Sequence, residues 1–392
     1  MDLYTLTPTF LANQTVDEFV SAIWTERYSK HGDTQLVLPA TAENIDKLAV
    51  GTYLALRGPK EVMKLETQSI ENGLLTVVGN TLDEAVLGER FIWAPNPEYS
   101  TGEDVTTRIA DYTDLTRKPG EFISHLVDRF VINTIAFGAA WLPATLDWAK
   151  EEIAELTLGA IDASGTVQRL TAPTGPLYPA LEQLAEQHKV GISLYLHDAD
   201  AETGFQLKFR TYQGLDRTSD QEVNELVRLT PELDGISDIK EVRSIAQFKN
   251  VVYVYYKGEV TKHLLFPDEP EPEGLDRRVL VTDAQGEPVG RKVTSWGGGG
   301  GYYQQEVVGA TEIAAFREQN AKDALANHNY IRSIDGKTSP ISDYRFGTDY
   351  FLGDLIELEG LTGAVSKARI TEYIRSQDKT GEKAYPTISV VD

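Results

Sequence analysis

The last fifty residues place the strongest constraint on the fold, because polar and apolar side chains alternate there between glycine-containing turns. Glycine supplies the positive φ of such turns, and aspartate can bond its own following backbone. The pattern predicts, in order, a strand from 344, a turn at 353–354, a strand to 358, a turn at 360–363, a long strand over 364–374, a turn at 378–381 and a short strand over 384–388. None of these residues forms a recognisable reactive constellation.

The N-terminal 95 residues show the same alternation. Residues 19–28 predict a strand that ends in a His31-Gly32-Asp33 turn, and Gln35 to Pro39 return from it. One short helix is predicted near 41–49. Further strands are predicted over 51–56, over 62–70 and, after an Asn72-Gly73 turn, over 74–79.

Both ends of the chain resemble the tail-tip hub proteins of siphophages. At the N-terminus the similarity rests on a W-x-x-R-Y strand from Trp24 to Tyr28, a G-D turn at Gly32-Asp33 and the segment from Leu82 to Trp93. At the C-terminus it rests on the closing meander over 344–388. The resemblance implies a β-rich α+β fold, resembling a baseplate hub, with two β-barrel domains similar to tail-tube proteins and an inserted α+β domain.

The middle of the chain predicts the inserted domain. Residues 96–104 are mostly turn formers, which favours a boundary at that point. Pro119 suits the first turn of a helix with an apolar stripe, and a second helix is predicted from Gly175-Pro176 to before Gly191. The stripes comprise Phe122, Ile123, Leu126, Val127 and Phe130 in the first helix, and Leu177, Leu181, Leu184 and Ala185 in the second.

The predicted division is a first barrel over 1–104, an α+β insertion over 105–212 and a second barrel over 213–392. A hairpin over 192–197 and 205–211 completes the insertion. The second barrel would contain strands at 226–230 and 250–256 and a helix near 311–328. Residues 267–274, rich in proline and glutamate, predict an exposed and extended loop.

Composition excludes several classes of protein. There is no cysteine among the 392 residues, which excludes disulfides, thiolate catalysis and cysteine metal sites, so stability must come from packing and association. No apolar run approaches the ~18 residues of a membrane helix, and residues 1–20 lack a secretory signal pattern. A protein of this kind that functions outside a cell would be assembled in the host cytoplasm and released, as a virion component is.

The formal net charge of −23 argues against a protein that grips phosphate backbones, because such binding needs a basic face. Two interpretations remain open. The charge can simply keep the protein soluble, or it can line an acidic channel that repels DNA passing through. Net charge does not locate the charged side chains, so the sequence does not decide between them.

Two short motifs fail the spacing that their chemistry requires. Asp198, Asp200 and Glu202 resemble the start of a calcium loop, but Thr203 and Phe209 occupy the positions that need Gly and Glu. A polar hairpin tip fits better. Gly336-Lys337-Thr338 resembles a phosphate loop, but Ile331 stands where the first Gly belongs, and a turn before Pro340 is predicted instead.

Five consecutive glycines, Gly297 to Gly301, lie between Trp296 and Tyr302-Tyr303. They lack the spacing of a dinucleotide fingerprint. The run predicts either an ordinary disordered surface loop or a mobile loop that becomes ordered against a partner.

No catalytic, cofactor-binding or metal-binding residue is predicted, and no cofactor. The histidines are scattered without H-E-x-x-H or paired helical spacing: His31, His125, His188, His197, His263 and His328. There is no G-x-S-x-G nucleophile elbow. With 60 carboxylates, sequence spacing cannot identify a glycosidase pair.

The resemblance implies a structural function rather than an enzymatic one. It implies a hub subunit at the distal tip of a non-contractile phage tail, where a homotrimer with two similar barrels per chain would adapt a hexameric tube to threefold symmetry. Implied partners are copies of the chain itself, a distal tail protein ring, the tape-measure protein, and receptor-binding or fibre proteins. DNA would only pass through the channel, and the chain would have no membrane span.

Two other function classes remain open. Tail-tip proteins can carry a peptidase or glycosidase that degrades the cell wall, although such activities usually occupy an added C-terminal domain. A carbohydrate-binding adhesin is suggested only by five Trp and 18 Tyr.

Overall fold

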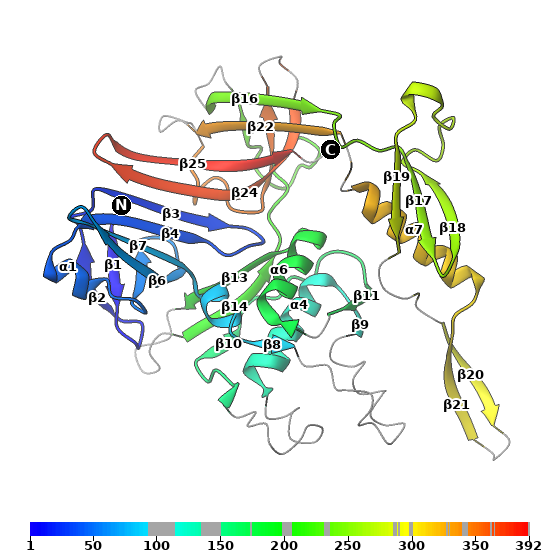
Figure 1. Cartoon of the computed structure of the whole chain (residues 1–392), viewed down its shortest axis with the longest axis horizontal. Helices are drawn as coiled ribbons and strands as arrows, with labels where there is room; N and C mark the ends of the chain where they lie inside the picture. Colours follow the sequence, from blue (N-terminus) through cyan, green and yellow to red (C-terminus); the bar gives the residue numbers. More distant parts are fainter. Residues whose placement is uncertain are drawn as a thin grey trace. The chain divides into compact units, whose positions relative to one another are not determined.

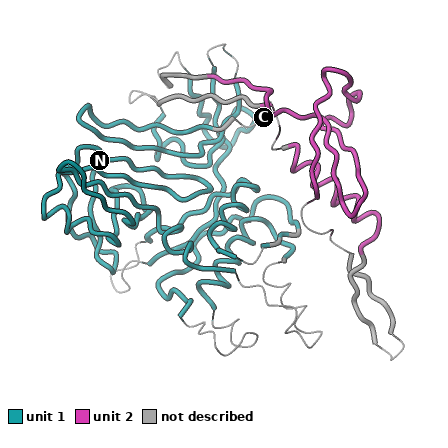
Figure 2. Tube along the Cα trace, in the orientation of Figure 1, with its two compact units in different colours: residues 1–240, 334–392 teal, residues 241–333 magenta. Residues whose placement is uncertain are grey.

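The computed structural model forms two compact units, residues 1–240 together with 334–392, and residues 241–333 (Figures 1 and 2). The structure describes residues 1–92, 114–134, 150–172, 175–197, 206–230, 236–284, 288, 291–297, 301–326, 328, 330–338, 344–360, 363 and 365–390. No described helix is long and apolar enough to span a membrane.

The first unit is built on an eleven-stranded mixed sheet, in which ten strands follow the order β15-β23-β24-β3-β4-β7-β6-β5-β1-β2 and β25 pairs with β24 (Figure 1). Within the described residues this path is open and does not close into a barrel. The β-rich class predicted from the sequence is confirmed. The strands are β1 (Leu3–Leu6), β2 (Ala12–Val16), β3 (Ser21–Arg27), β4 (Asp33–Pro39), β5 (Tyr53–Leu56), β6 (Val62–Glu71), β7 (Leu74–Thr81), β15 (Arg228–Leu229), β23 (Leu355–Glu359), β24 (Val365–Asp378) and β25 (Gly381–Val390).

The two ends of the chain meet in this sheet. β24 pairs antiparallel with β3, with Glu372 opposite Arg27 and Gln377 opposite Ala22. Strands that are more than 300 residues apart in sequence therefore lie side by side and share one set of backbone hydrogen bonds.

Alternation along the strands explains which face is buried. In β3, Trp24 points inward, whereas its neighbour Ile23 is exposed. Leu36 and Val77 fill the same layer from β4 and β7, because successive side chains in a strand point to opposite faces. The alternation read from the sequence thus identifies the core of the N-terminal strands.

The predicted Asn72-Gly73 turn is confirmed. Both residues have positive φ, 52° and 79°, as a two-residue hairpin turn of this chemistry requires. The turn joins β6 to β7. The predicted short helix is also present as α1 (Ala42–Lys47), where the Thr41 hydroxyl accepts a hydrogen bond from the Asn44 amide at 3.1 Å.

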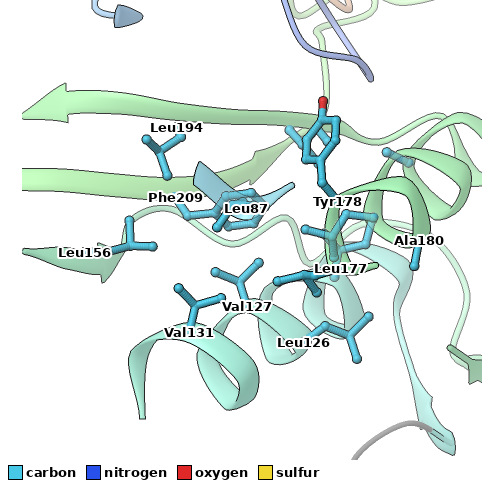
Figure 3. Packing of buried hydrophobic residues seen from close by; sticks show 14 of the residues in the cluster. Leu87, Leu126, Val127, Val131, Leu156, Leu177, Tyr178, Ala180, Leu194 and Phe209 are labelled. Carbon is cyan, nitrogen blue, oxygen red and sulfur yellow. The ribbon is translucent and has the colours of Figure 1, made fainter. Parts of the chain in front are cut away.

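A helical layer packs on a small sheet in the middle of the chain (Figure 3). The predicted stripe residues Phe122, Ile123, Leu126 and Val127 of α4 are all buried. They share one core with α6 and with Leu82, Leu87 and Ile92 of the N-terminal segment. The elements are α2 (Leu82–Leu87), β8 (Phe91–Ile92), β9 (Asp114–Arg117), α4 (Pro119–Val127), the π-helix η2 (Asp128–Ile132), β10 (Leu156–Leu158), β11 (Gln168–Thr171), β12 (Gly175–Pro176), α6 (Leu177–His188), β13 (Gly191–His197) and β14 (Gln206–Tyr212).

The predicted hairpin over 192–197 and 205–211 is confirmed as β13 and β14. The end of the preceding helix differs in detail from the expectation. Lys189, with φ 55° and ψ 42°, provides the left-handed residue that ends α6. Gly191 is instead the first residue of β13.

One strand prediction near the C-terminus was wrong, and another gave a strand that is too short. Residues 344–352 form turns with one isolated bridge between Phe346 and Tyr350, and the Phe346 ring stacks on Tyr373 with centroids 3.6 Å apart. Ring packing thus fixes a turn in which alternation suggested a strand. The final strand, β25, is long rather than short, and pairs with β24 down to Asp378 opposite Gly381.

The second unit contains a three-stranded sheet with α7 packed against one face. The predicted strand over 250–256 and the predicted helix near 311–328 are confirmed as β17 and α7, and residues 267–274 form the expected exposed loop. Its elements are β17 (Val251–Tyr256), β18 (Glu259–Leu264), the 3-10 helix η4 (Gly274–Asp276), β19 (Val279–Asp283), β20 (Arg291–Gly297), β21 (Gly301–Val307) and α7 (Ala310–Ala326). A further two-stranded sheet pairs β16 (Ile236–Ser244) with β22 (Ile331–Thr338).

Candidate functional site

The strand from Trp24 to Tyr28, on which the sequence resemblance rests, ends where three distant stretches of chain meet. The backbone amide of Tyr28 donates to the Thr371 carbonyl at 2.9 Å, and its own carbonyl accepts from the Ile192 amide at 3.0 Å. Its hydroxyl donates to the Lys189 carbonyl at 2.8 Å. Through its backbone and its buried side chain, Tyr28 therefore joins the large sheet to the α6–β13 segment and to β24.

Three glycines allow this convergence. A Cβ on Gly353 or on Gly191 would overlap the Tyr28 ring, and a Cβ on Gly214 would overlap the Gly353 backbone. Gly353 also has a φ of 88°. We call Tyr28, Gly191, Gly214 and Gly353 the Tyr28 junction.

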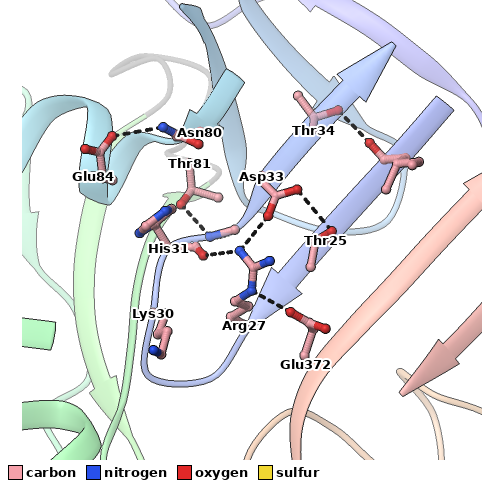
Figure 4. Close-up of polar contacts among 12 residues, drawn as sticks. Thr25, Arg27, Lys30, His31, Asp33, Thr34, Asn80, Thr81, Glu84 and Glu372 are labelled. Carbon is pink, nitrogen blue, oxygen red and sulfur yellow. Dashed lines mark hydrogen bonds and ion pairs between the residues drawn. The ribbon is translucent and has the colours of Figure 1, made fainter. Parts of the chain in front are cut away.

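Arg27 holds the turn that follows β3 (Figure 4). Its guanidinium contacts Glu372 of β24 at 2.5 Å and Asp33 of β4 at 2.6 Å, and donates to the His31 carbonyl at 2.9 Å. Burial lowers the pKa of Arg27, but hydrogen bonds to Glu372 and Asp33 outweigh it and raise the pKa above its ordinary value. The arginine of the W-x-x-R-Y pattern thus fixes the junction between β3 and β24.

A group of carboxyls, of which Glu26 and Asp83 are buried and Glu61 is half-buried, lies beside this junction. Glu26 pairs with Arg375 of β24, and Glu61 accepts a hydrogen bond from the Ser193 hydroxyl at 3.0 Å. Asp83 accepts from the Thr81 hydroxyl and, at 2.9 Å, from the Glu84 amide. Burial, together with the charges of Glu26 and Asp83, raises the pKa of Glu61 to about 8. Burial also raises the pKa values of Glu26 and Asp83.

Sequence reasoning did not single out these carboxyls among the 60 acidic residues. One signal was available for Glu26. It shares the inward face of β3 with Trp24 and Tyr28, because residues two apart in a strand point the same way. A charged residue at such a position needs an opposite charge beside it, which the half-buried Arg375 supplies.

The predicted Gly353-Asp354 turn organises a second buried group. The Asp354 carboxylate accepts from the Leu215 amide at 2.7 Å, from Arg217 Nε at 2.7 Å and from the Phe351 amide at 3.0 Å. Sequence reasoning expected aspartate to bond its own following backbone. The carboxylate instead binds a preceding amide and ties β23 to the segment after β14.

The motifs considered in the sequence fall in different places. Gly336 to Thr338 form the end of β22, a strand rather than the predicted turn. Asp198 to Glu202 lie outside the described residues. Gly297 and Gly301 are opposite each other at the end of the β20–β21 hairpin, with Trp296 opposite Tyr302, and the three glycines between them are outside the described residues.

The histidines do not gather into one site. His125 is buried on the stripe of α4, His31 lies edge-on to Tyr178, and His197 lies edge-on to Tyr195. The remaining three have separate neighbours: His188 contacts Gln168, His263 contacts Thr261, and His328 contacts the Ala324 carbonyl. Among the described residues, no three His, Asp or Glu side chains are arranged to hold a metal ion.

The polar groups described above therefore connect chain segments. The Arg27, Tyr28 and Asp354 contacts each join stretches of sequence more than 100 residues apart. Their geometry suits a rigid building block.

Comparison with known proteins agrees with this description. The family model described as Siphovirus ReqiPepy6 Gp37-like protein matches residues 2–388. No curated protein is significantly similar in sequence.

Three solved structures share the fold over the whole chain. The 43 kDa tail protein of prophage MuSo2 from Shewanella oneidensis is 12% identical with a TM-score of 0.52, and the match covers 100% of this chain and 98% of that one. The tail protein from Neisseria meningitidis MC58 is 10% identical, with a TM-score of 0.53 and coverage of 100% and 96%. Prophage tail protein gp18 from Listeria monocytogenes EGD-e is 11% identical, with a TM-score of 0.50 and coverage of 100% and 95%.

Proposed function

The chain belongs to the Siphovirus ReqiPepy6 Gp37-like protein family, and from that membership we propose that it is a structural hub subunit at the distal tip of a non-contractile phage tail. In this role it is a virion component. It surrounds the channel through which DNA leaves the tail.

The observation that carries the proposal is the similarity of fold, along the full chain, to three proteins described as phage tail proteins. The ion pairs beside the Tyr28 junction agree with it. Arg27, Glu372 and Asp33 form ion pairs that hold strands in place, and a building block of a particle needs this kind of rigidity.

We propose further that the chain assembles as a homotrimer. Residues 1–104 and 213–392 each supply one tube-like region of a six-part ring, and residues 105–212 lie on its outside. Residues 241–333, a compact unit of their own, are inserted in the third region. A ring of three chains with two similar parts each can continue a sixfold tube.

The partners in this proposal are other tail proteins: copies of the chain, the distal tail ring, the tape-measure protein and receptor-binding or fibre proteins. We propose an acidic channel wall, from which DNA is repelled rather than bound, as one of the two roles that a net charge of −23 allows.

Labelling of intact particles tests the location. Antibodies against this chain should decorate only the end of the tail that is distant from the capsid. Decoration along the tube or at the capsid, or absence of the chain from purified particles, would contradict the proposal.

A further inference from the structure

The sheet of the second unit has one face covered by a helix and one face open. Val252 and Val254 of β17 pack against Ala321 and Leu325 of α7. Residues two apart in a strand share a face, so Tyr253 and Tyr255 point away from α7.

The open face is apolar. Tyr255 is 45% exposed and stands directly opposite Val260 of β18, which is 49% exposed. Val281 of β19, 60% exposed, stands directly opposite Tyr253, next to Tyr255. Exposed apolar side chains that adjoin one another on a sheet face are typical of surfaces that bind a partner.

Ion pairs and hydrogen bonds hold the proline- and glutamate-rich loop between β18 and β19 against this same face. Glu271 contacts Lys262 of β18 and Arg277, each at 2.5 Å. Arg277 also donates to the Tyr253 hydroxyl at 2.9 Å and to the Pro272 carbonyl at 3.1 Å. Hydrogen bonds from Lys262 and Arg277 hold the pKa of Glu271 below its ordinary value.

The fastened loop displays an apolar side chain that contacts nothing in the described part of the chain. Leu275 is 103% exposed, at the centre of η4. The loop is anchored on both sides of it, by Glu271 and by the hydrogen bond from the Asn250 amide group to the Asp276 carbonyl at 2.7 Å. A leucine displayed on an anchored loop loses little conformational freedom when a partner covers it.

The border of this face is acidic. Loop residues 266–276 contain five acidic residues and no basic one. The two basic side chains that reach the face, Lys262 and Arg277, are already paired with Glu271. Asp283 lies at the opposite end of the face, opposite Tyr255.

We propose that this docking face, consisting of Tyr255, Val260, Val281 and Leu275 with the acidic loop beside them, binds another protein of the same tail. The matching surface of that protein is an apolar patch bordered by lysine and arginine. The inference rests on the proposed function. A second copy that met this face with its own acidic loop would place like charges against each other.

Site-specific photo-cross-linking in assembled tails tests the proposal. Benzoylphenylalanine is placed at Leu275 in one variant and at Val281 in another. Lys322, on the helix that covers the other face, serves as the control position. All three side chains are exposed, so none of these replacements disturbs the core.

Mass spectrometry of purified tails first establishes that each variant is present. If the chain is absent from tails, the proposed function fails, and that outcome is separate from the docking test. If the chain is present, we expect Leu275 and Val281 to cross-link to one other tail protein, at peptides rich in lysine and arginine, and Lys322 not to do so.

A variant with fewer acidic side chains in the loop tests the contribution of charge. Combined Asp268→Asn, Glu269→Gln and Glu273→Gln changes should lower the cross-link yield at Leu275 about tenfold, because they neutralise three of the five acidic loop residues without touching the loop anchors. Cross-links to a second copy of the chain, no cross-link at either position, equal yields at Lys322, or an unchanged yield in this triple variant would overturn the proposal.

Discussion

At the residue scale, the fold depends on glycines at positions where a larger side chain would overlap neighbouring atoms. Tyr28 is buried where β3, β13 and the turn before β23 converge. Gly191 and Gly353 leave room for its ring, and Gly214 leaves room for the Gly353 backbone. A methyl group at any of the three positions would displace either the Tyr28 ring or backbone.

The first prediction concerns Gly353→Ala. The new Cβ would overlap the Tyr28 ring, and the φ of 88° is unfavourable for alanine. We expect a loss of about 2–4 kcal/mol in the free energy of unfolding, from overpacking and backbone strain together. Urea denaturation followed by circular dichroism measures it.

Gly73→Ala is the matched control. Gly73 has a similar φ of 79°, and nothing lies within 4 Å of its added Cβ. Gly73→Ala should lower the free energy of unfolding only by the cost of backbone strain, about 1 kcal/mol. Equal losses in the two variants would show that the approach of Gly353 to Tyr28 is not important for stability.

The second prediction concerns Asp354→Ala. The change leaves Arg217 and two backbone amides, of Leu215 and Phe351, without their buried acceptor. Removing one member of a buried ion pair typically destabilises by about 3–5 kcal/mol. Thermal or urea unfolding should show a loss of this size.

Asp220→Ala removes an ion pair of the same kind at the surface. Asp220 pairs with Lys367, and both side chains are exposed. We expect a loss of about 1 kcal/mol or less, because exposed pairs contribute little. A loss for Asp354→Ala no larger than this would contradict the burial argument.

At the element scale, local pattern was enough to predict several strands that have one face exposed to solvent. The alternation of Trp24, Leu36 and Val77 with exposed neighbours predicted β3, β4 and β7, and the stripe of α4 predicted a buried helix. These elements bury a regular side, so their period appears in the sequence.

Local sequence pattern did not predict the structure where contacts between residues far apart in sequence determine it. Residues 344–352 alternate like a strand, but the stacking of Phe346 on Tyr373 holds them in turns. The pairing of β24 with β3 joins residues about 350 apart, and no local signal announces it. Asp354 likewise could be placed in a turn from the sequence, but its partner Arg217 could not be identified.

The third prediction concerns the carboxyls that join β3, β13 and α2. Burial and the charges of Glu26 and Asp83 raise the pKa of Glu61 from 4.5 to about 8. The folded protein therefore holds a proton that the unfolded chain releases above pH 4.5. Stability should fall as the pH rises from about 4.5 to about 8, since the unfolded state binds fewer protons there.

Glu61→Gln keeps an acceptor for the Ser193 hydroxyl and cannot ionise. The half-buried position of Glu61 leads us to expect a gain of about 1–2 kcal/mol over wild type at pH 8, and no gain below pH 4.5. Melting temperatures across the pH range measure it, with the exposed Glu71→Gln as control. A gain that does not depend on pH would show that the Glu61 charge is not responsible.

At the scale of the whole molecule, the family was predictable from the sequence, but the order of the strands in the sheet was not. The motifs at the two ends predicted a siphophage tail protein, and the family model over residues 2–388 confirms this. The strand order from β15 to β2 depends on pairings between the ends of the chain, which only the structure reveals.

The fourth prediction concerns catalysis. The polar groups at the Tyr28 junction are engaged in structural contacts, and we expect the purified chain to release no fragments from the peptidoglycan of any susceptible host. Release of soluble muropeptides, followed by chromatography, measures this. Reproducible cleavage that is abolished by one carboxylate substitution would establish an enzyme instead.

The fifth prediction is the assembly itself. A chain without cysteine cannot use disulfides, and we expect association to supply part of its stability. We expect a homotrimer around a central channel, with more than about 2,000 Å² buried in each contact between chains, the range of obligate interfaces. The channel-facing surface should be net acidic.

The symmetry of this protein in the intact tail tests the central claim most directly. Electron cryo-microscopy averaging of tail tips should show three copies around the axis, with two similar parts of each chain alternating to continue the sixfold tube. Six equivalent copies, or one central copy, would contradict the account.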